Sequence, residues 1–167
     1  KTGAFSIGIL NNIDSTLKKT QYIILTPTHE LAKQIYNVVE NLGARMDISI
    51  CKVIGKTNIN DSIRELQRDP QIIVATPGRL FDMINKRHIF TDNISTLVID
   101  EADEMLSSGF MEVLQNIIRC IPKTCQMCLF SATMPKEIVD LTENFMNNPE
   151  KLLINKRTIV TNTAITI

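Results

Sequence analysis

Three acidic residues, Asp100, Glu101 and Asp103, follow directly after the apolar run 97–99. A short, wholly apolar run is typical of a strand that is buried on both faces of a parallel sheet. A buried carboxylate is unfavourable unless a cation or hydrogen-bond donors compensate it. Because ligands of open α/β sheets bind at the carboxyl ends of the strands, these acids indicate a site. We expect Asp100 to hold Mg²⁺ through water and Glu101 to orient or deprotonate an attacking water.

The alternative interpretation of these acids is structural. Carboxylates also stabilise the first turn of a helix, where they suit the positive end of the helix dipole. The choice between the two interpretations depends on whether other strand ends carry complementary groups.

The first residues, Lys1-Thr2-Gly3, precede a segment with helical character. A P-loop ends in Gly-Lys-Ser/Thr before a helix, with the lysine on the β- and γ-phosphates and the hydroxyl on Mg²⁺. Together with the acidic strand end, this pattern makes Lys1 and Thr2 the expected last residues of a P-loop whose glycines lie outside the sequence.

Three further strand ends carry groups that suit a phosphate. Each combines groups such as a hydroxyl, a proline at the first helical position and a nearby cation. The backbone N–H groups of the first helical turn are then free and lie beside a positive charge, which suits a phosphate. When the stretches at 27–32 and 76–79 are each taken alone, plain helix capping is the better explanation, and the stretch at 55–58 can be a simple turn. The residues are Pro27, Thr28, His29, Gly55, Lys56, Thr76, Pro77, Gly78 and Arg79.

Two hydroxyls, Ser131 and Thr133, flank Ala132 at a later strand end. If all these corners lie at one edge of a sheet, the hydroxyls can bond the acids at 100–103 and connect two corners. A Ser/Thr turn before Pro135 is the simpler explanation.

Apolar runs of strand length alternate with segments of helical period along the chain. Strict alternation predicts an α/β fold, a parallel β-sheet with helices on both faces. The expected strands cover residues 22–26, 48–54, 71–75, 96–100, 125–130 and 152–154. The expected helices cover residues 4–17, 30–42, 61–66, 80–85, 111–121 and 136–147. The apolar face expected for the second helix consists of Leu31, Ile35, Val38, Val39 and Leu42.

The composition, with 167 residues, 44% apolar and 22% charged, is typical of one globular domain. A formal charge of zero, from 18 basic and 18 acidic residues, argues against purely electrostatic binding of nucleic acid. Binding through backbone amides and helix N-termini stays open. No apolar run approaches the about 20 residues that span a membrane, so we expect no membrane association.

The four cysteines are Cys51, Cys120, Cys125 and Cys128. The last three have the spacing of plant-type iron–sulfur proteins, but Cys125 and Cys128 fall in one expected strand and would point to opposite faces. Metal ligands must converge on one point. Unpaired, buried cysteines in a reducing compartment, the cytoplasm or the nucleus, are therefore the better interpretation.

Taken in order, these motifs resemble those of the first RecA-like domain of the DEAD-box RNA helicases, which are P-loop NTPases. The matching stretches are 1–2, 27–32, 55–58, 76–79, 100–103 and 131–133. A closer likeness, through 77–83, 98–105 and 130–135, is to the initiation-factor-4A group of this family. The resemblance covers residues 1–154, beginning inside the P-loop, and leaves 155–167 as a tail or the start of an interdomain linker.

The resemblance implies an enzyme that uses ATP and Mg²⁺, binds the sugar–phosphate backbone of RNA and locally opens duplexes. It makes Lys1 and Thr2 contacts of phosphate and magnesium, Asp100 the magnesium ligand through water, and Glu101 the activator of water. It assigns coupling between hydrolysis and strand opening to Asp103, Ser131 and Thr133. It assigns contacts with the RNA backbone, along what we call the RNA path, to Pro27, Thr28, Gly55, Thr76, Pro77, Gly78 and Arg79.

Two positions in the expected RNA-binding loops depart from the family pattern. His29 stands where the family usually has arginine, and Lys56 stands where it usually has a second glycine. These departures affect the expected strength of RNA binding and its dependence on pH.

The resemblance leaves two functions open, an RNA helicase or an ATP-gated RNA clamp that recruits partner proteins. An unrelated P-loop ATPase would leave the motifs at 76–79 and 131–133 unexplained. The expected partners are the second RecA-like domain of the same full-length chain and translation-initiation or RNA-processing proteins. Because the second domain and its arginine finger are not in the sequence, we expect the fragment alone to be nearly inactive.

Overall fold

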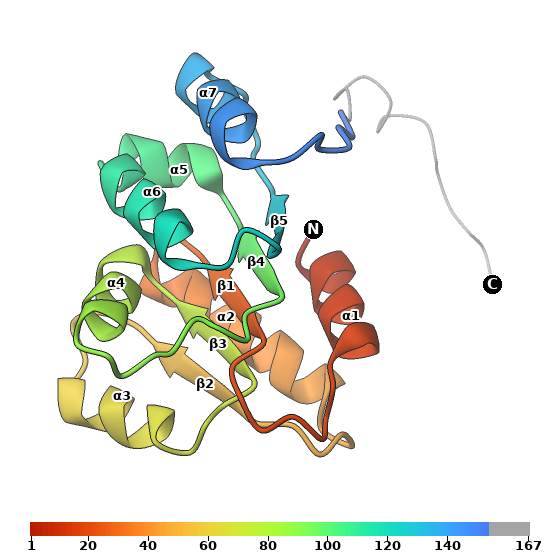
Figure 1. Cartoon of the computed structure of the whole chain (residues 1–167), viewed down its shortest axis with the longest axis vertical. Helices are drawn as coiled ribbons and strands as arrows, with labels where there is room; N and C mark the ends of the chain where they lie inside the picture. The colour runs from red at the N-terminus through yellow and green to blue at the C-terminus, as the bar shows by residue number, and fades with distance from the viewer. Residues whose placement is uncertain (154–167) are drawn as a thin grey trace.

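The computed structural model describes residues 1–153, which fold around a five-stranded β-sheet (Figure 1). The strands are β1 (Tyr22–Leu25), β2 (Ile50–Val53), β3 (Ile72–Ala75), β4 (Thr96–Ile99) and β5 (Gln126–Leu129). Their order is β2-β3-β1-β4-β5, and every neighbouring pair is parallel. Each connection contains at least one helix, because a parallel pair needs a crossover. The predicted α/β fold is confirmed.

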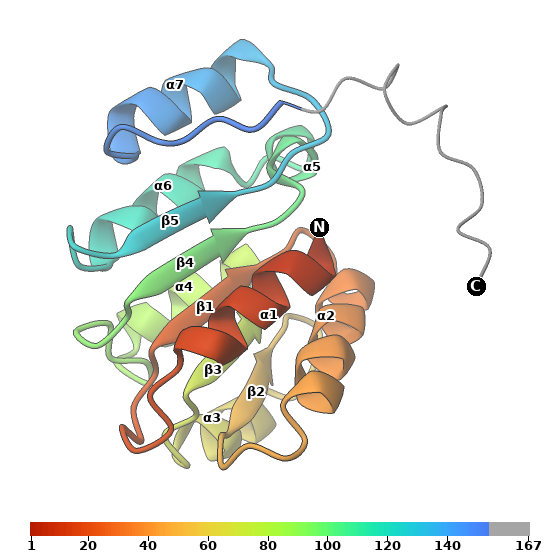
Figure 2. The same ribbon diagram turned by 90° about the vertical axis from the view of Figure 1, so that its right-hand side faces the viewer.

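The helices cover both faces of the sheet, with α1 and α2 on one face and α4 and α6 on the other (Figure 2). Their bounds are α1 (Thr2–Asn12), α2 (His29–Leu42), α3 (Ile59–Leu66), α4 (Pro77–Asn85), α5 (Ala102–Ser107), α6 (Met111–Cys120) and α7 (Lys136–Phe145). No helix within residues 1–153 is both long and apolar enough to span a bilayer.

The core consists of two apolar layers, one on each side of the sheet. Strands β1 and β3 are buried at every residue, whereas the edge strand β5 is only half-buried. Successive residues of a strand enter opposite layers. Accordingly, Cys125 packs against the layer beneath α4 and α6, and Cys128 packs against the layer beneath α1 and α2, as predicted.

The strand register brings all five carboxyl ends level with one another. The paired residues at these ends are Val53, Ala75, Leu25, Ile99 and Leu129. The ladder continues one residue further, because Thr26 N donates to Ala75 O at 3.1 Å and Asp100 N donates to Leu25 O at 2.9 Å. The loops after all five strands therefore leave the sheet at the same edge.

The first helix is shorter than the predicted 4–17, since it ends at Asn12 and Ile13 is extended. The carboxylate of Asp14 accepts hydrogen bonds from the N–H and hydroxyl of Thr16, at 2.9 and 2.6 Å. Such local side-chain bonds compete with helical backbone bonds, so they account for the early end of α1.

The predicted strand 152–154 is wrong for the two of its residues that the structure describes. Leu152 and Leu153 belong to no strand and are 88% and 80% exposed. A short apolar stretch without a neighbouring strand gains neither ladder hydrogen bonds nor burial. Ile154 and the expected tail 155–167 lie outside the described residues.

Two details of the helices also differ from expectation. Leu42, predicted to lie on the apolar face of α2, is 50% exposed, because the buried face of this helix runs through Ala32, Ile35 and Val39. Helix α5 was not among the predicted helices. Its six residues are too few for a clear apolar period.

Two glycines provide a test of the packing around α1. A Cβ at Gly43, which follows α2, would lie 2.9 Å from Ile48 Cδ1 and 3.2 Å from Val39 O, whereas a Cβ at Gly8 within α1 would meet nothing within 4 Å. We expect Gly43→Ala to lower the free energy of unfolding by about 1 kcal/mol through overpacking. We expect Gly8→Ala to raise it by up to about 1 kcal/mol, because alanine favours a helix. Urea unfolding measures both, and equal losses of stability would contradict this packing.

Candidate functional site

The carboxyl edge, with its loops and the first turns of the helices that follow them, holds the residues that the sequence singled out for chemistry. Across the sheet these loops and turns carry residues 55–56 after β2, 76–79 after β3, 27–29 after β1, 100–103 after β4 and 131–133 after β5. Lys1 and Thr2 reach the same edge at the N-terminus of α1 (Figure 2). The groups expected to contact phosphate thus follow β2, β3 and β1, and the acids and paired hydroxyls follow β4 and β5.

Asp100 is the buried acid of this edge, at 3% exposure. Its Oδ1 accepts a hydrogen bond of 3.1 Å from the N–H of Glu101. Burial raises the pKa of the Asp100 carboxyl above its ordinary value, although the Glu101 N–H and the charge of Lys1 favour the ionised form. The remaining lone pairs of this carboxylate suit a hydrated divalent cation.

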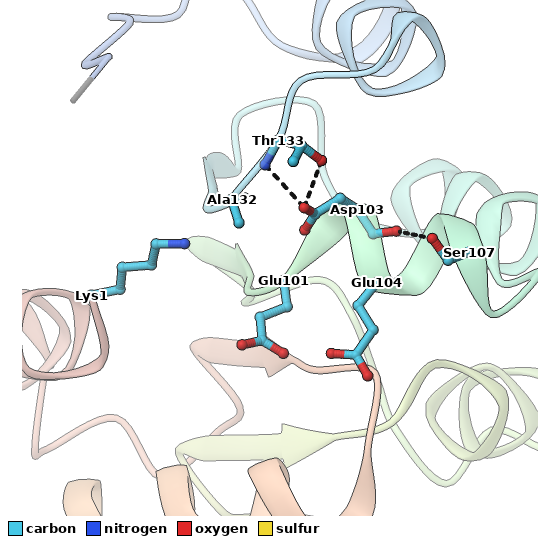
Figure 3. Close-up of a pocket in the computed structure, with 7 residues that line it drawn as sticks. All are labelled: Lys1, Glu101, Asp103, Glu104, Ser107, Ala132 and Thr133. Atoms are coloured by element: carbon cyan, nitrogen blue, oxygen red, sulfur yellow. Dashed lines mark hydrogen bonds between the residues drawn. The ribbon is translucent and has the colours of Figure 1, made fainter. Parts of the chain in front are cut away.

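Glu101 connects β4 to α5 through a left-handed backbone conformation, with φ 53° and ψ 52°. This conformation is uncommon for a residue other than glycine, and such strain concentrates at functional sites. The side chains of Glu101 and Glu104 extend side by side (Figure 3). The Glu104 carboxyl and partial burial raise the pKa of Glu101, which makes its carboxylate a stronger proton acceptor.

An open pocket of about 360 Å³ lies beside these acids. The side chain of Lys1 extends from α1 toward the loops after β4 and β5 (Figure 3). The residues that line the pocket are Lys1, Glu101, Asp103, Glu104, Ser107, Ala132 and Thr133. One solvent-accessible pocket is therefore lined by a cation, by the paired carboxylates of Glu101 and Glu104, and by residues of the loop after β5.

Asp103 and Thr133 connect the loops after β4 and β5. Asp103 Oδ2 accepts hydrogen bonds from the N–H and the hydroxyl of Thr133, at 2.9 and 2.7 Å, while Ser131 Oγ donates to Thr133 O at 2.6 Å. Burial alone would raise the pKa of Asp103, but the bonds from Thr133 outweigh it and hold the pKa at about 2. The expected link between these corners is thus observed as a direct contact through Thr133, with Ser131 supporting it.

The structural interpretation of the acids holds in part, because Asp103 and Glu104 lie in the first turn of α5, where carboxylates suit the helix dipole. Glu101 occupies the N-cap position but makes no side-chain capping bond. The Asp103 carboxylate bonds Thr133 of another loop rather than the first turn of its own helix. Glu101, Asp103 and Glu104 therefore line the pocket, and Asp103 also bonds the loop after β5, whereas Asp100 is buried.

The groups around the pocket fit a magnesium nucleotide. The N-terminus of α1 has no side-chain cap and no acid in its first turn, so its N–H groups and Lys1 suit a phosphate. Asp100 offers a carboxylate close enough to Lys1 for their charges to interact. Within residues 1–153 no cluster of three or more His, Cys, Asp or Glu groups could hold a metal ion by itself, so phosphate oxygens and water would have to complete its coordination.

The loops after β1, β2 and β3 contact one another closely. Gly55 N donates to Thr76 Oγ1 at 3.2 Å, and a Cβ at Gly55 would lie 3.2 Å from His29 Nε2. Thr28 caps α2 by accepting from Leu31 N, so the capping interpretation holds for its hydroxyl. Gly55 is thus the residue at which the three loops approach most tightly.

Arg79 is engaged within the protein, because its guanidinium donates to Thr57 O at 3.0 Å and to Ser62 Oγ at 3.3 Å. These bonds fix the loop after β2 to the first turn of α4. Lys56 in that loop is exposed and has a left-handed backbone with φ 55°. It is therefore better placed than Arg79 to contact a ligand in solvent.

Two residues of this edge, Glu104 and Ser62, were missed by sequence reasoning, and the stretch 55–58 was recognised without the role of the Thr57 carbonyl. Glu104 carries a signal, since residues three apart on a helix are neighbours, but using it requires α5 to be recognised. Thr57 contributes a backbone carbonyl, for which side-chain patterns give no signal.

The family described as DEAD/DEAH box helicase matches residues 1–141. ATP-dependent RNA helicases eIF4A of Meyerozyma guilliermondii and Eremothecium gossypii are 47% and 49% identical to the chain over 156 residues, which cover 93% of this chain. The chain spans only 39% of the length of these relatives.

Two solved structures share the fold. A DEAD box protein from Methanococcus jannaschii superposes with a TM-score of 0.84 at 36% identity, covering 88% of this chain and 40% of that one. A hypothetical ATP-dependent RNA helicase from Sulfolobus tokodaii gives a TM-score of 0.80 at 33% identity, covering 89% of this chain and 43% of that one.

The contact of Asp103 with Thr133 predicts a dependence of stability on pH. The pKa of Asp103 is held at about 2, below its ordinary value of 3.8, so its contribution is complete above about pH 4 and lost as the pH falls through about 2. We expect Asp103→Asn to lower the free energy of unfolding at pH 7 by about 1 kcal/mol, because a charge-assisted bond becomes neutral.

Urea unfolding of both proteins between pH 7 and pH 2 tests this. The difference in stability should narrow below about pH 4 and disappear near pH 2. A difference that stays constant over this range would show that the charge of Asp103 is not what stabilises the contact.

Proposed function

We propose that residues 1–154 form the first RecA-like domain of an ATP-dependent RNA helicase. The proposal starts from the fact that the chain belongs to the DEAD/DEAH box helicase family and has its RecA-like fold. Residues 155–167 would begin the linker to a second RecA-like domain. The observation that carries the proposal is that Lys1 and Glu101 line one pocket at the edge where Asp103 bonds Thr133, with the Asp100 carboxylate close enough to Lys1 for their charges to interact. The eIF4A names of the relatives favour a role in translation initiation in the cytoplasm, with initiation factors as partners.

Lys1, Thr2 and Asp100 would hold the nucleotide and its metal. The Lys1 ammonium and the first N–H groups of α1 would bind the phosphates. The Thr2 hydroxyl and, through water, Asp100 would bind Mg²⁺. ATP bound with Mg²⁺ supplies a transferable phosphoryl group whose developing charge the metal neutralises.

Glu101 would act on the hydrolytic water. Its backbone is left-handed where β4 ends, and its side chain lines the pocket. Because Glu104 raises the pKa of Glu101, the Glu101 carboxylate is a stronger proton acceptor. Asp100 differs because it is buried and bonded to the Glu101 N–H. The two acids therefore take different roles, one as metal ligand and one as base.

RNA would bind along the loops after β2, β3 and β1 through its sugar–phosphate backbone. Backbone N–H groups at the start of α4 and α2 suit phosphates without requiring a strongly basic surface. This agrees with the zero formal charge of the chain. The residues proposed for this path are Pro27, Thr28, His29, Gly55, Lys56, Thr76, Pro77, Gly78 and Arg79.

Coupling of hydrolysis to strand opening would pass through Asp103 and the loop after β5. Asp103 lies in the first turn of α5, two residues after Glu101, and its bonds to Thr133 transmit any shift of that turn to residues 131–133. Ser131 restrains the same loop by bonding Thr133 O. The contact is thus a physical connection between the acids and the exit of β5.

Glu101→Gln in the full-length protein tests the proposed chemistry. The amide keeps the size of the side chain but cannot accept a proton, so RNA-stimulated ATP hydrolysis should fall at least about 100-fold while ATP binding persists. Glu112→Gln, which alters an exposed acid on α6, is the matched control and should leave turnover unchanged. Unchanged turnover in Glu101→Gln would remove this residue from the chemistry.

His29→Arg in the full-length protein tests the RNA path. Arginine is charged at every working pH, whereas histidine is charged only in the lower part of the physiological range. If His29 contacts a phosphate, the variant should bind single-stranded RNA about fivefold more tightly at pH 8, a gain of about 1 kcal/mol. It should also lose the strengthening on acidification that we expect of the original protein.

RNA affinity measured from pH 8 to pH 6 at one salt concentration distinguishes the outcomes. Lys33→Arg, a like-charged change at an exposed position of α2, controls for general effects of arginine. Parallel curves for His29→Arg and the original protein would show that residue 29 does not contact the RNA.

A further inference from the structure

Thr26, which directly follows β1, is an unexplained polar residue at the centre of the carboxyl edge. Its side chain is fully buried, at 0% exposure, and its hydroxyl has no hydrogen-bond partner among residues 1–153. Buried hydroxyls in native proteins are nearly always bonded, so an unpaired one at a functional edge requires an explanation. None of the roles assigned above uses this group.

The register places Thr26 between Thr76 and Asp100. Leu25 pairs with Ala75 on one side and with Ile99 on the other, and both ladders continue for one more residue. Neighbouring strands lie about 4.8 Å apart, so the three residues form a row across β3, β1 and β4.

The row lies on the face of the sheet that α1 and α2 cover. Two positions earlier in these strands stand Val74, Ile24 and Val98, all members of the apolar layer on that face. Side chains two residues apart in a strand share a face, which puts Thr76, Thr26 and Asp100 together. All three are buried, at 6%, 0% and 3% exposure.

Helix α1 passes over this row with a second unpaired hydroxyl. The ring of Phe5 lies 5.4 Å from the ring of Phe130, which follows β5 at the level of Asp100. The next residue of the helix, Ser6, is fully buried, and its hydroxyl also lacks a partner among the described residues. Polar groups without partners thus occur on the helix and on the sheet around the buried carboxylate of Asp100.

We propose that Thr26 is a positioning residue whose hydroxyl hydrogen-bonds both Thr76 and the Asp100 carboxylate when a magnesium nucleotide is bound. A hydroxyl donates one bond and accepts two, so it can serve both neighbours. Thr76 Oγ1 already accepts from Gly55 N in the RNA-binding loop. Residues Gly55, Thr76, Thr26 and Asp100 then form a continuous chain from that loop to the metal ligand. This inference rests on the proposed function of both ends of the chain.

The experiment measures how strongly nucleotide and RNA binding affect each other in the full-length protein. RNA affinity is determined with and without Mg²⁺ and a non-hydrolysable ATP analogue, and the ratio of the two affinities is the coupling factor. Thr26→Val removes the hydroxyl at nearly constant shape and should lower this factor about tenfold, the size expected for one bond to a charged group. Thr26→Ser keeps the hydroxyl and should retain the factor.

Two further measurements separate this role from a structural one. RNA affinity without nucleotide should be unchanged in Thr26→Val, and its melting temperature should be equal or higher, since an unpaired buried hydroxyl is replaced by a methyl group. Thr142→Val, at a buried threonine of α7 that bonds Val139 O, is the control and should lose stability without losing coupling. Should Thr26→Val melt early, Thr26→Ala carries the same test without adding an atom.

The outcomes distinguish the two proposals. If the original protein shows RNA binding that depends on nucleotide and Thr26→Val shows the same coupling factor, the role of Thr26 is overturned and the proposed function stands. If the original protein shows no such dependence, the proposed function fails and this inference fails with it. A loss of coupling in Thr26→Ser equal to that in Thr26→Val would also overturn the role of the hydroxyl.

Discussion

Because all five strands run in one direction and end in register, five loops that are distant in sequence leave the sheet at one edge. Parallel pairing demands a crossover after each strand, so each loop opens into a helix whose free N–H groups face that edge. Backbone groups supply much of the positive potential in such an arrangement. A chain with no formal net charge can therefore present an edge that suits phosphates.

Within this edge, acids of the same loop experience opposite environments. Asp100 is buried and Glu101 lies beside Glu104, so the pKa of each is raised. Asp103, three residues after Asp100, has its pKa lowered to about 2 by the bonds from Thr133. Residues 100–103 thus hold one carboxylate that stays ionised down to about pH 2 beside two whose pKa is raised. The turn between β4 and α5 is made at Glu101, whose backbone is left-handed.

The parts of the fold that the sequence predicted are those governed by burial and period. Interior strands such as β1 read as continuous apolar runs because both faces are covered, and the helices between them show a clear apolar period. The prediction of a strand at residues 152–153 was wrong because an apolar run becomes a strand only when a neighbouring strand pairs with it. Helix α5 was missed because its start is set by the backbone turn at Glu101, which side-chain patterns do not encode.

In the candidate site, sequence could propose which residue types gather at the edge but not which atoms they contact. The partners of Arg79, a backbone carbonyl and a serine hydroxyl, depend on the path of a loop after another strand. The unpaired hydroxyl of Thr26 likewise has no sequence signal, since it is defined by the absence of a partner among the described residues. Both features, the partners of Arg79 and the unpaired Thr26 hydroxyl, are defined only by the three-dimensional structure.

The bonds between Asp103 and Thr133 join positions that are 30 residues apart. During folding, these bonds cannot form until α5 and α6 have crossed over and β5 has docked on β4, because Thr133 reaches Asp103 only from the end of β5. Contacts of such sequence separation form slowly, since the loop between them loses conformational entropy before any bond is made. The Asp103–Thr133 contact is therefore completed only after β5 has docked on β4, so a partly folded chain emerging from the ribosome would lack a finished carboxyl edge.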